Sequence, residues 1–190
     1  MMMRKTTMGF LLVASVGVAT AVAQTPAPPP TLDIVGSLKL QHQNIRRNLA
    51  ASAEKMPEAD YAFRPQGAPP EVRTFGQIVA HLVAANYNLC ASVKPEPAPK
   101  HAANDKEVQP KADLVKMLNE ALAYCDAIYD SQTSASINEM LKRTGPNNTT
   151  LERARGNTLI SNIAHNNEHY GNLVTYMRAK GIVPPSSEGR

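Results

Sequence analysis

The chain has 190 residues, with 20 Lys and Arg against 16 Asp and Glu and a formal net charge of +4. Two of the basic residues, Arg4 and Lys5, stand near the start, and the other charges are mixed along the chain, without a basic stripe interleaved with aromatics. The composition therefore argues against nucleic-acid binding, and the length favours one domain with a buried core.

The first residues have the pattern of a secretory signal peptide. Arg4 and Lys5 precede an apolar run at 10–23, which ends in the tripeptide A-V-A before Gln24. The run is too short and too rich in small residues for a membrane span, and no cysteine follows directly to carry a lipid anchor. We expect residues 1–23 to be removed from an exported protein, periplasmic or secreted. The alternative is a segment that is retained as an N-terminal anchor.

A Pro-rich spacer at 24–31 separates this leader from a domain expected at 32–185. The first helix is predicted at 32–55, because its inward positions recur every three or four residues. Those positions are Val35, Leu38, His42, Ile45, Leu49, Ser52 and Met56. Pro57 ends the helix. The position of His42 favours a core or capping histidine, with metal ligation as the alternative.

Three more long helices are predicted farther along the chain. They span 75–93, 111–131 and 150–180, and each has apolar residues at helical spacing. Gly181 is suited to end the last one, because glycine adopts the left-handed conformation at little cost. A weaker helical segment is predicted at 134–142, before a break rich in Gly, Pro and Asn.

The segments between these helices are rich in proline. Residues 57–73 form a connector, and Thr74 is expected as the N-cap of the second helix, with Gln77 forming only part of a capping box. Residues 94–110 form a long solvated crossover, in which His101 is expected at the surface. No strand, repeat or transmembrane span is predicted, so the fold class is all-α, a four-helix bundle.

Three histidines have positions suited to a metal site. His165 and His169 lie one turn apart on a polar flank of the last helix. His81 lies on the same-signed flank of the second helix, so the three face one another if these two helices are antiparallel neighbours. Three neutral imidazoles fit one divalent ion and leave positions for water or substrate. The alternative is a chance pair of histidines on a solvated helix flank.

Two cysteines, Cys90 and Cys125, are the other candidate site residues. An exported chain meets an oxidising environment, in which the two can form a disulfide. Two buried free thiols fit the same positions equally well, so the residues alone leave both states open.

Three stretches resemble the DinB-like (DinB/YfiT) family of metal-binding four-helix bundles. They are FGQIVAHLVAANY around His81, AHNNEHYGNLVTYMRAKGIVPP near the end, and the connector EKMPEADYAFRP. The last block is similar to the family pattern H-x-x-x-H-R-G-Q. The likeness covers about residues 32–185 and implies that His81, His165 and His169 are the three metal ligands.

The chain departs from the family pattern at two positions. Tyr170 stands where many members have Arg, and Asn172 where they have Gln, so a role of those side chains in holding an anionic substrate does not carry over. The resemblance implies an up-down-down-up bundle whose long second crossover is the stretch 94–110. The second and third helices would then be parallel, with Cys90 and Cys125 at similar heights, which favours a disulfide.

The resemblance leaves three functions to distinguish. The first is a metal-dependent hydrolase of an unidentified small molecule, with zinc expected before nickel, manganese or iron. Glu168 is a weak candidate for its general base, because it lies about 100° from His169 around the helix. The second is a metal-dependent thiol S-transferase, and the third is a non-catalytic module that binds metal or a ligand. The substrate and the formation of a homodimer stay open.

Overall fold

The computed structural model describes residues 32–94, 96–144 and 146–189. The predicted signal peptide at 1–23 and the predicted spacer at 24–31 lie outside the described residues. Within the described part of the chain, no helix is both long enough and apolar enough to cross a membrane.

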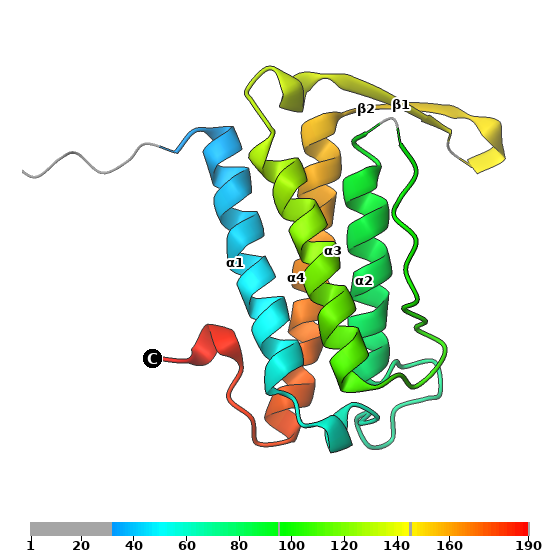
Figure 1. Ribbon diagram of the computed structural model, residues 1–190, viewed down its shortest axis with the longest axis vertical. Coiled ribbons are helices and arrows are strands. Elements are labelled where there is room, and N and C mark those ends of the chain that lie inside the picture. Colours follow the sequence, from blue (N-terminus) through cyan, green and yellow to red (C-terminus); the bar gives the residue numbers. More distant parts are fainter. Residues whose placement is uncertain (1–31, 95, 145, 190) are drawn as a thin grey trace, which may run out of the picture. The chain divides into compact units, whose positions relative to one another are not determined.

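Four α-helices form a bundle within the described residues (Figure 1): α1 (Ile34–Lys55), α2 (Phe75–Ala91), α3 (Lys111–Asp130) and α4 (Arg155–Ala179). Helices α1 and α4 run in one direction and α2 and α3 in the other (Figure 1). Each of α1 and α2 packs against both α3 and α4. The segment between α2 and α3 returns along the bundle, as the second crossover of the predicted all-α, up-down-down-up bundle should, and this fold is confirmed.

Local side chains fix the ends of the helices. Asp33 Oδ1 accepts a hydrogen bond of 2.7 Å from Gly36 N at the start of α1. At α2, Thr74 Oγ1 accepts from Gln77 N, and Gln77 Oε1 accepts from Thr74 N, so the capping box is complete rather than partial. Gly181 has a φ of 72° directly after the last turn of α4, as predicted for its C′ residue.

A β-hairpin lies between α3 and α4, where no strand was predicted. Strand β1 (Met140–Thr144) pairs antiparallel with β2 (Thr150–Ala154). Asn147 and Asn148, in the turn, both have a φ of 57°, a left-handed conformation that asparagine tolerates better than most residues. The hairpin crosses the end of the bundle at which α2 and α3 terminate (Figure 1).

The helix predicted at 134–142 is therefore wrong, and α4 begins at Arg155 rather than near Thr150. The segment contains only a short 3-10 turn, Ser136–Asn138, before β1. Strand β2 is exposed along most of its length, so it lacks the alternation of buried and exposed residues by which a strand is recognised in a sequence.

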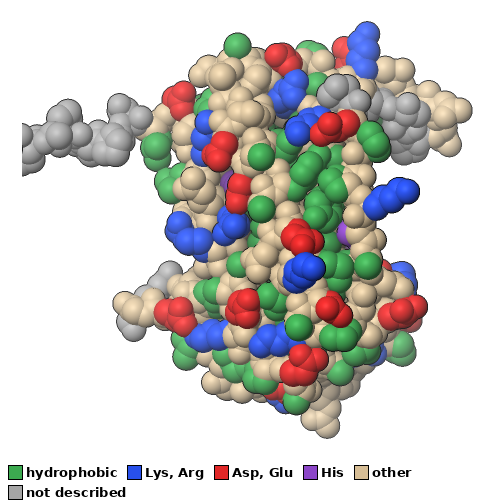
Figure 2. All heavy atoms as spheres, in the orientation of Figure 1, with side chains coloured by type: hydrophobic (Ala, Val, Ile, Leu, Met, Phe, Trp, Pro, Cys, Tyr) green, Lys and Arg blue, Asp and Glu red, His purple; other side chains and the backbone are tan. Residues whose placement is uncertain are grey.

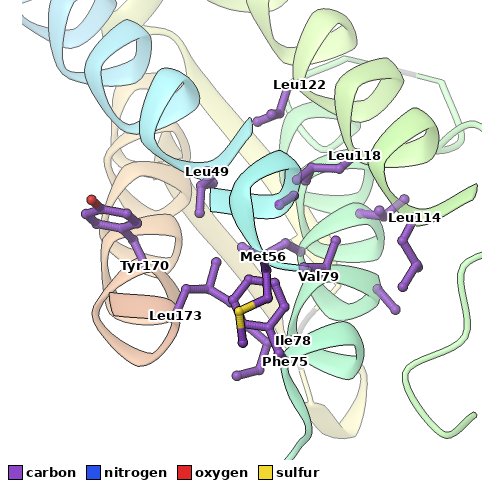
Figure 3. Close-up of a cluster of buried hydrophobic side chains, with 14 of the residues drawn as sticks. Leu49, Met56, Phe75, Ile78, Val79, Leu114, Leu118, Leu122, Tyr170 and Leu173 are labelled. Carbon is purple, nitrogen blue, oxygen red and sulfur yellow. The ribbon is translucent and has the colours of Figure 1, made fainter. Parts of the chain in front are cut away.

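The half of the bundle nearest the connector holds the main hydrophobic core (Figure 3). All four helices contribute fully buried side chains to it: Leu49, Met56, Phe75, Leu82, Leu114, Leu118, Leu122, Leu173 and Met177. Burying one such side chain contributes about 1.5–3 kcal/mol. Tyr61, from the connector, closes this end of the core, since its hydroxyl donates a 2.6 Å hydrogen bond to the buried carbonyl of Ala53.

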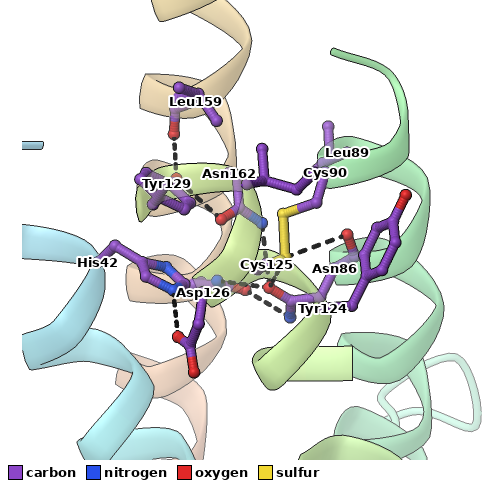
Figure 4. Close-up of a disulfide and its surroundings, with 12 residues drawn as sticks. His42, Asn86, Leu89, Cys90, Tyr124, Cys125, Asp126, Tyr129, Leu159 and Asn162 are labelled. Carbon is purple, nitrogen blue, oxygen red and sulfur yellow. Dashed lines mark hydrogen bonds and ion pairs between the residues drawn. A yellow bond between two sulfur atoms is a disulfide. The ribbon is translucent and has the colours of Figure 1, made fainter. Parts of the chain in front are cut away.

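The other half of the bundle contains a disulfide (Figure 4). Cys90 of α2 and Cys125 of α3 are joined, with their Cα atoms 5.5 Å apart, and both side chains are completely buried. The two residues can meet because α2 and α3 are parallel neighbours and both cysteines lie near the ends of their helices. Of the two states that the sequence left open, the structure has the disulfide.

Buried amides beside the disulfide connect α2 to α4. Asn86 Nδ2 donates to Asn166 Oδ1 at 3.1 Å, while Asn166 Nδ2 donates back to Asn86 Oδ1 at 2.9 Å. Asn162 Nδ2 donates to the same Asn86 oxygen at 3.1 Å, and Tyr129 of α3 donates from its hydroxyl toward Asn162 Oδ1 at 3.0 Å. A buried amide left without a partner costs about 1–3 kcal/mol, so this network disfavours sliding of α2 along α4.

Charged side chains of both signs are scattered over the face of the molecule in view in Figure 2, with Lys and Arg interspersed with Asp and Glu. Several are paired across elements, such as Lys180 with Asp60 at 2.7 Å and Lys142 with Glu152 at 3.2 Å. Ion pairs at the surface contribute about 0–1 kcal/mol each, so the bundle depends on its core rather than on them.

The disulfide yields a stability prediction. It closes a loop with a sequence separation of 35 residues, so replacing both Cys90 and Cys125 by Ser should lower the free energy of unfolding by about 2–4 kcal/mol. Urea unfolding of oxidised wild type and of the double variant measures the difference. Two free thiols in wild-type protein denatured without reductant would contradict the pairing.

Candidate metal centre

The three predicted histidines come together where α2 packs against α4. His81 Nε2 lies 3.2 Å from His165 Nε2, although the two residues are 84 positions apart in the sequence. The ring centroid of His169 lies 4.8 Å from that of His81 and 4.5 Å from that of His165. One nitrogen from each ring belongs to a set whose members all lie within 4.8 Å of one another.

Helix geometry accounts for this convergence. His165 and His169 are one turn apart on α4, so their side chains project from the same flank. Helix α2 runs antiparallel to α4 beside it, and this brings the flank that carries His81 opposite the pair. The sequence argument required this antiparallel arrangement, and the fold supplies it.

The residues present fit a divalent ion. Two nitrogens bound to one tetrahedral zinc at about 2.0–2.1 Å lie about 3.3–3.4 Å apart, close to the 3.2 Å between His81 and His165. The Nδ1 atom of His165 is buried and has no hydrogen-bond partner among the described residues. The three imidazoles of the cluster are thus crowded together, and at least one of their ring nitrogens has no hydrogen-bond partner among the described residues.

The surroundings keep these imidazoles neutral. Burial lowers the pKa of His169 from 6.5 to about 4, helped by the repulsion that positive charge on His165 and His81 would exert. Burial likewise lowers the pKa values of His165 and His81, with Arg73 adding to the effect at His81. Neutral imidazole is the form that binds metal, so the cluster is ready for an ion at neutral pH.

Other polar groups surround the cluster. Asp105 Oδ2, on the crossover between α2 and α3, lies 3.4 Å from His81 Nδ1 and accepts hydrogen bonds of 3.1 and 2.8 Å from Arg73. Asn172 Nδ2 lies 3.3 Å from His169 Nδ1, and an amide can serve this nitrogen as donor or acceptor. A pocket of about 320 Å³ adjoins Asp105 and is lined by Pro70, Glu71, Arg73, Gln77, Asp105 and Lys106.

The two remaining histidines lie elsewhere. His42 is buried, stacks on Tyr129 with ring centroids 3.9 Å apart, and lies 2.8 Å from Asp126 Oδ1 through its Nε2. It is the core histidine that the sequence favoured. His101 is exposed on the crossover, as predicted, where its ring stacks on that of Tyr87 at 5.6 Å.

Other candidate residues also have clear positions. Glu168 is exposed on α4 and makes no hydrogen bond or ion pair with any described residue. Tyr170, where many family members have Arg, is buried, and its hydroxyl accepts a 2.9 Å hydrogen bond from Ser186 N. Tyr170 therefore anchors the segment after α4.

Sequence reasoning missed Asp105 and Arg73, because both stand in irregular segments without a periodic pattern.

An antiparallel helix pair that carries three convergent histidines inside a four-helix bundle defines a class of protein. The family model of the DinB superfamily matches residues 41–173. The chain belongs to the DinB superfamily, as its resemblance at three stretches implied. A comparison with curated proteins finds no match.

Solved structures share the fold at low sequence identity. A DinB-like protein from Bacillus subtilis has a TM-score of 0.58 at 16% identity and covers 76% of this chain and 92% of its own. A DinB-like protein from Bacillus cereus has a TM-score of 0.59 at 16% identity, with coverages of 80% and 95%. A conserved protein from Enterococcus faecalis has a TM-score of 0.56 at 12% identity, with coverages of 78% and 97%.

The lowered pKa of His169 predicts how acid affects the metal-free protein. The unfolded chain protonates this ring near 6.5 and the folded chain near 4, so between these values the unfolded state binds more protons. The contribution of neutral His169 to the free energy of unfolding is complete above about pH 6.5 and is lost as the pH falls toward 4. Urea midpoints measured in chelator from about pH 7 to about pH 5 should decline.

A pair of variants isolates this effect from the titration of other groups. His169→Gln should show a shallower decline than wild type, whereas His101→Gln, at an exposed position, should follow wild type. Equal declines in all three proteins would contradict the assignment.

Proposed function

We propose that the protein binds one divalent metal ion through His81, His165 and His169 and uses it to hydrolyse a small molecule. The observation that carries the proposal is the set of three neutral imidazoles with ligand nitrogens within 4.8 Å. Only these three side chains form such a group among the described residues, fewer than the four of a closed structural zinc site.

Each part of the site would have a distinct role. The two histidines of α4 supply two nitrogens from one rigid helix, and His81 supplies a third from the facing helix. When bound, an ion in such an open site lowers the pKa of a water ligand and polarises a scissile bond. Glu168 is exposed and forms no hydrogen bond or ion pair with the three histidines, and its charge reaches His165 and His169 only as an electrostatic effect, so its position gives little support to a role as general base.

Zinc is the first choice of metal, since three imidazoles and one exchangeable position are typical of catalytic zinc. Nickel, manganese and iron stay as alternatives, because imidazole also binds these ions. The metal present in protein purified without a histidine tag, measured by elemental analysis, decides among them.

Substitution of the ligands tests the metal site directly. His81→Ala, His165→Ala and His169→Ala should each weaken zinc binding by more than about 100-fold, because loss of an outer-shell partner alone costs about 10–100-fold. His101→Ala, at an exposed position, should bind like wild type. A folded His81→Ala protein that retains its metal would contradict the three-ligand site.

Activity assays distinguish the proposed hydrolase from the two alternatives. Turnover of a panel of small esters and amides that depends on added metal supports hydrolysis. Product that forms only with a low-molecular-weight thiol indicates a thiol S-transferase. Stoichiometric metal without any turnover indicates a binding module.

We also propose that the protein is exported and loses residues 1–23. The basic start, the apolar run and the A-V-A tripeptide support this, and so does the Cys90–Cys125 disulfide, since disulfides persist in oxidising compartments. N-terminal sequencing of protein recovered from outside the cytoplasm should begin at or near Gln24. An intact Met1 on that material would contradict cleavage.

A further inference from the structure

One carboxylate reaches the histidine cluster from outside the helices. Asp105 lies on the crossover between α2 and α3, and its Oδ2 is 3.4 Å from His81 Nδ1. His81 Nε2, on the opposite side of the same ring, is the atom that lies 3.2 Å from His165 Nε2. The imidazole of His81 therefore lies between the Asp105 carboxylate and the other histidines of the cluster.

This position determines which nitrogen of His81 carries the proton. An ionised carboxylate only accepts hydrogen bonds, so it favours the tautomer with hydrogen on Nδ1. The lone pair of the neutral ring is then on Nε2, directed at the cluster. Arg73 donates two hydrogen bonds to Asp105 Oδ2, and its positive charge favours the ionised form of this carboxylate.

Arg73 is itself fixed in place from α4. Its Nε and Nη2 donate to Asp105 Oδ2 at 3.1 and 2.8 Å, and its backbone carbonyl accepts a 2.8 Å hydrogen bond from the hydroxyl of Tyr176. Tyr176 lies on the same helix as His165 and His169. The contacts thus run from α4 through Arg73 and Asp105 to His81 on α2.

We propose, building on the metal centre proposed above, that Asp105 is a positioning residue that fixes the tautomer and orientation of His81 for metal binding. The second crossover then belongs to the site, because it supplies this carboxylate. Metal bound at Nε2 makes Nδ1–H a stronger donor to Asp105, so metal binding and docking of the crossover strengthen each other by the same factor.

The first test measures metal affinity. Wild type, Asp105→Ala and Asp105→Asn are titrated with Zn²⁺ in competition with a chromophoric chelator, and Asp113→Asn serves as the control because it removes an exposed carboxylate at the start of α3. Both Asp105 variants should bind zinc about 10–100-fold more weakly than wild type, and the control should be unchanged. Equal affinities for all four proteins would overturn the proposal.

The second test needs no metal and reads the tautomer itself. In metal-free wild type, nitrogen chemical shifts of the His81 ring should report the Nδ1–H form, and Asp105→Ala should shift the ring toward a mixture of tautomers. A ring unaffected by the substitution would overturn the proposal even in a variant that binds zinc weakly. If wild type bound no zinc, the proposed function would fail while this measurement still tested the role of Asp105.

The third test addresses the crossover. Hydrogen exchange of backbone amides in residues 100–108 should slow when Zn²⁺ is added to wild type, and should not respond in Asp105→Ala at saturating zinc. If Asp105 has only a structural role, hydrogen exchange in the crossover should be faster in Asp105→Ala, but exchange in wild type should not change when Zn²⁺ is added. Exchange in wild type that does not respond to Zn²⁺ would therefore contradict the coupling.

Discussion

The register between α2 and α4 is the constraint on which the site depends, and buried amides set it. Asn86 exchanges hydrogen bonds with Asn166, and it also accepts one from Asn162 one turn earlier on α4. A slide of one turn would separate these amides in a place that water does not reach. His165 directly precedes Asn166 in the chain, so the contacts that align the helices also place the histidines opposite each other.

The sequence predicted most of the helices, which have a periodic pattern of apolar residues, and little of the structure in the irregular segments. The four helices, Thr74 as a cap and Gly181 as a stop all depend on residues within a few positions of one another, which is why local patterns revealed them. The hairpin left no such pattern, since its strands are short and β2 is mostly exposed. A stretch of neutral propensity at 134–142 then resembled a helix more than a strand.

The histidine cluster shows the same division. Angular positions around the helices predicted His81, His165 and His169 as ligands, because the angular position of a residue on a helix can be calculated from the sequence. Asp105 and Arg73 are 32 residues apart on two irregular segments, and their meeting depends on the path of the crossover across the bundle. Residue spacing in the sequence does not predict such contacts, so the part of the site that lies outside the helices could be found only from the structure.

The disulfide has a consequence for the integrity of the folded chain. Cys90 and Cys125 flank the crossover, so the Pro-rich stretch 94–110 lies inside a covalently closed ring. A protease that cuts within this exposed stretch leaves both fragments linked through the sulfur bridge. The nicked molecule would run as one piece on a non-reducing gel and as two after reduction, and it would keep its four helices together although its backbone is broken.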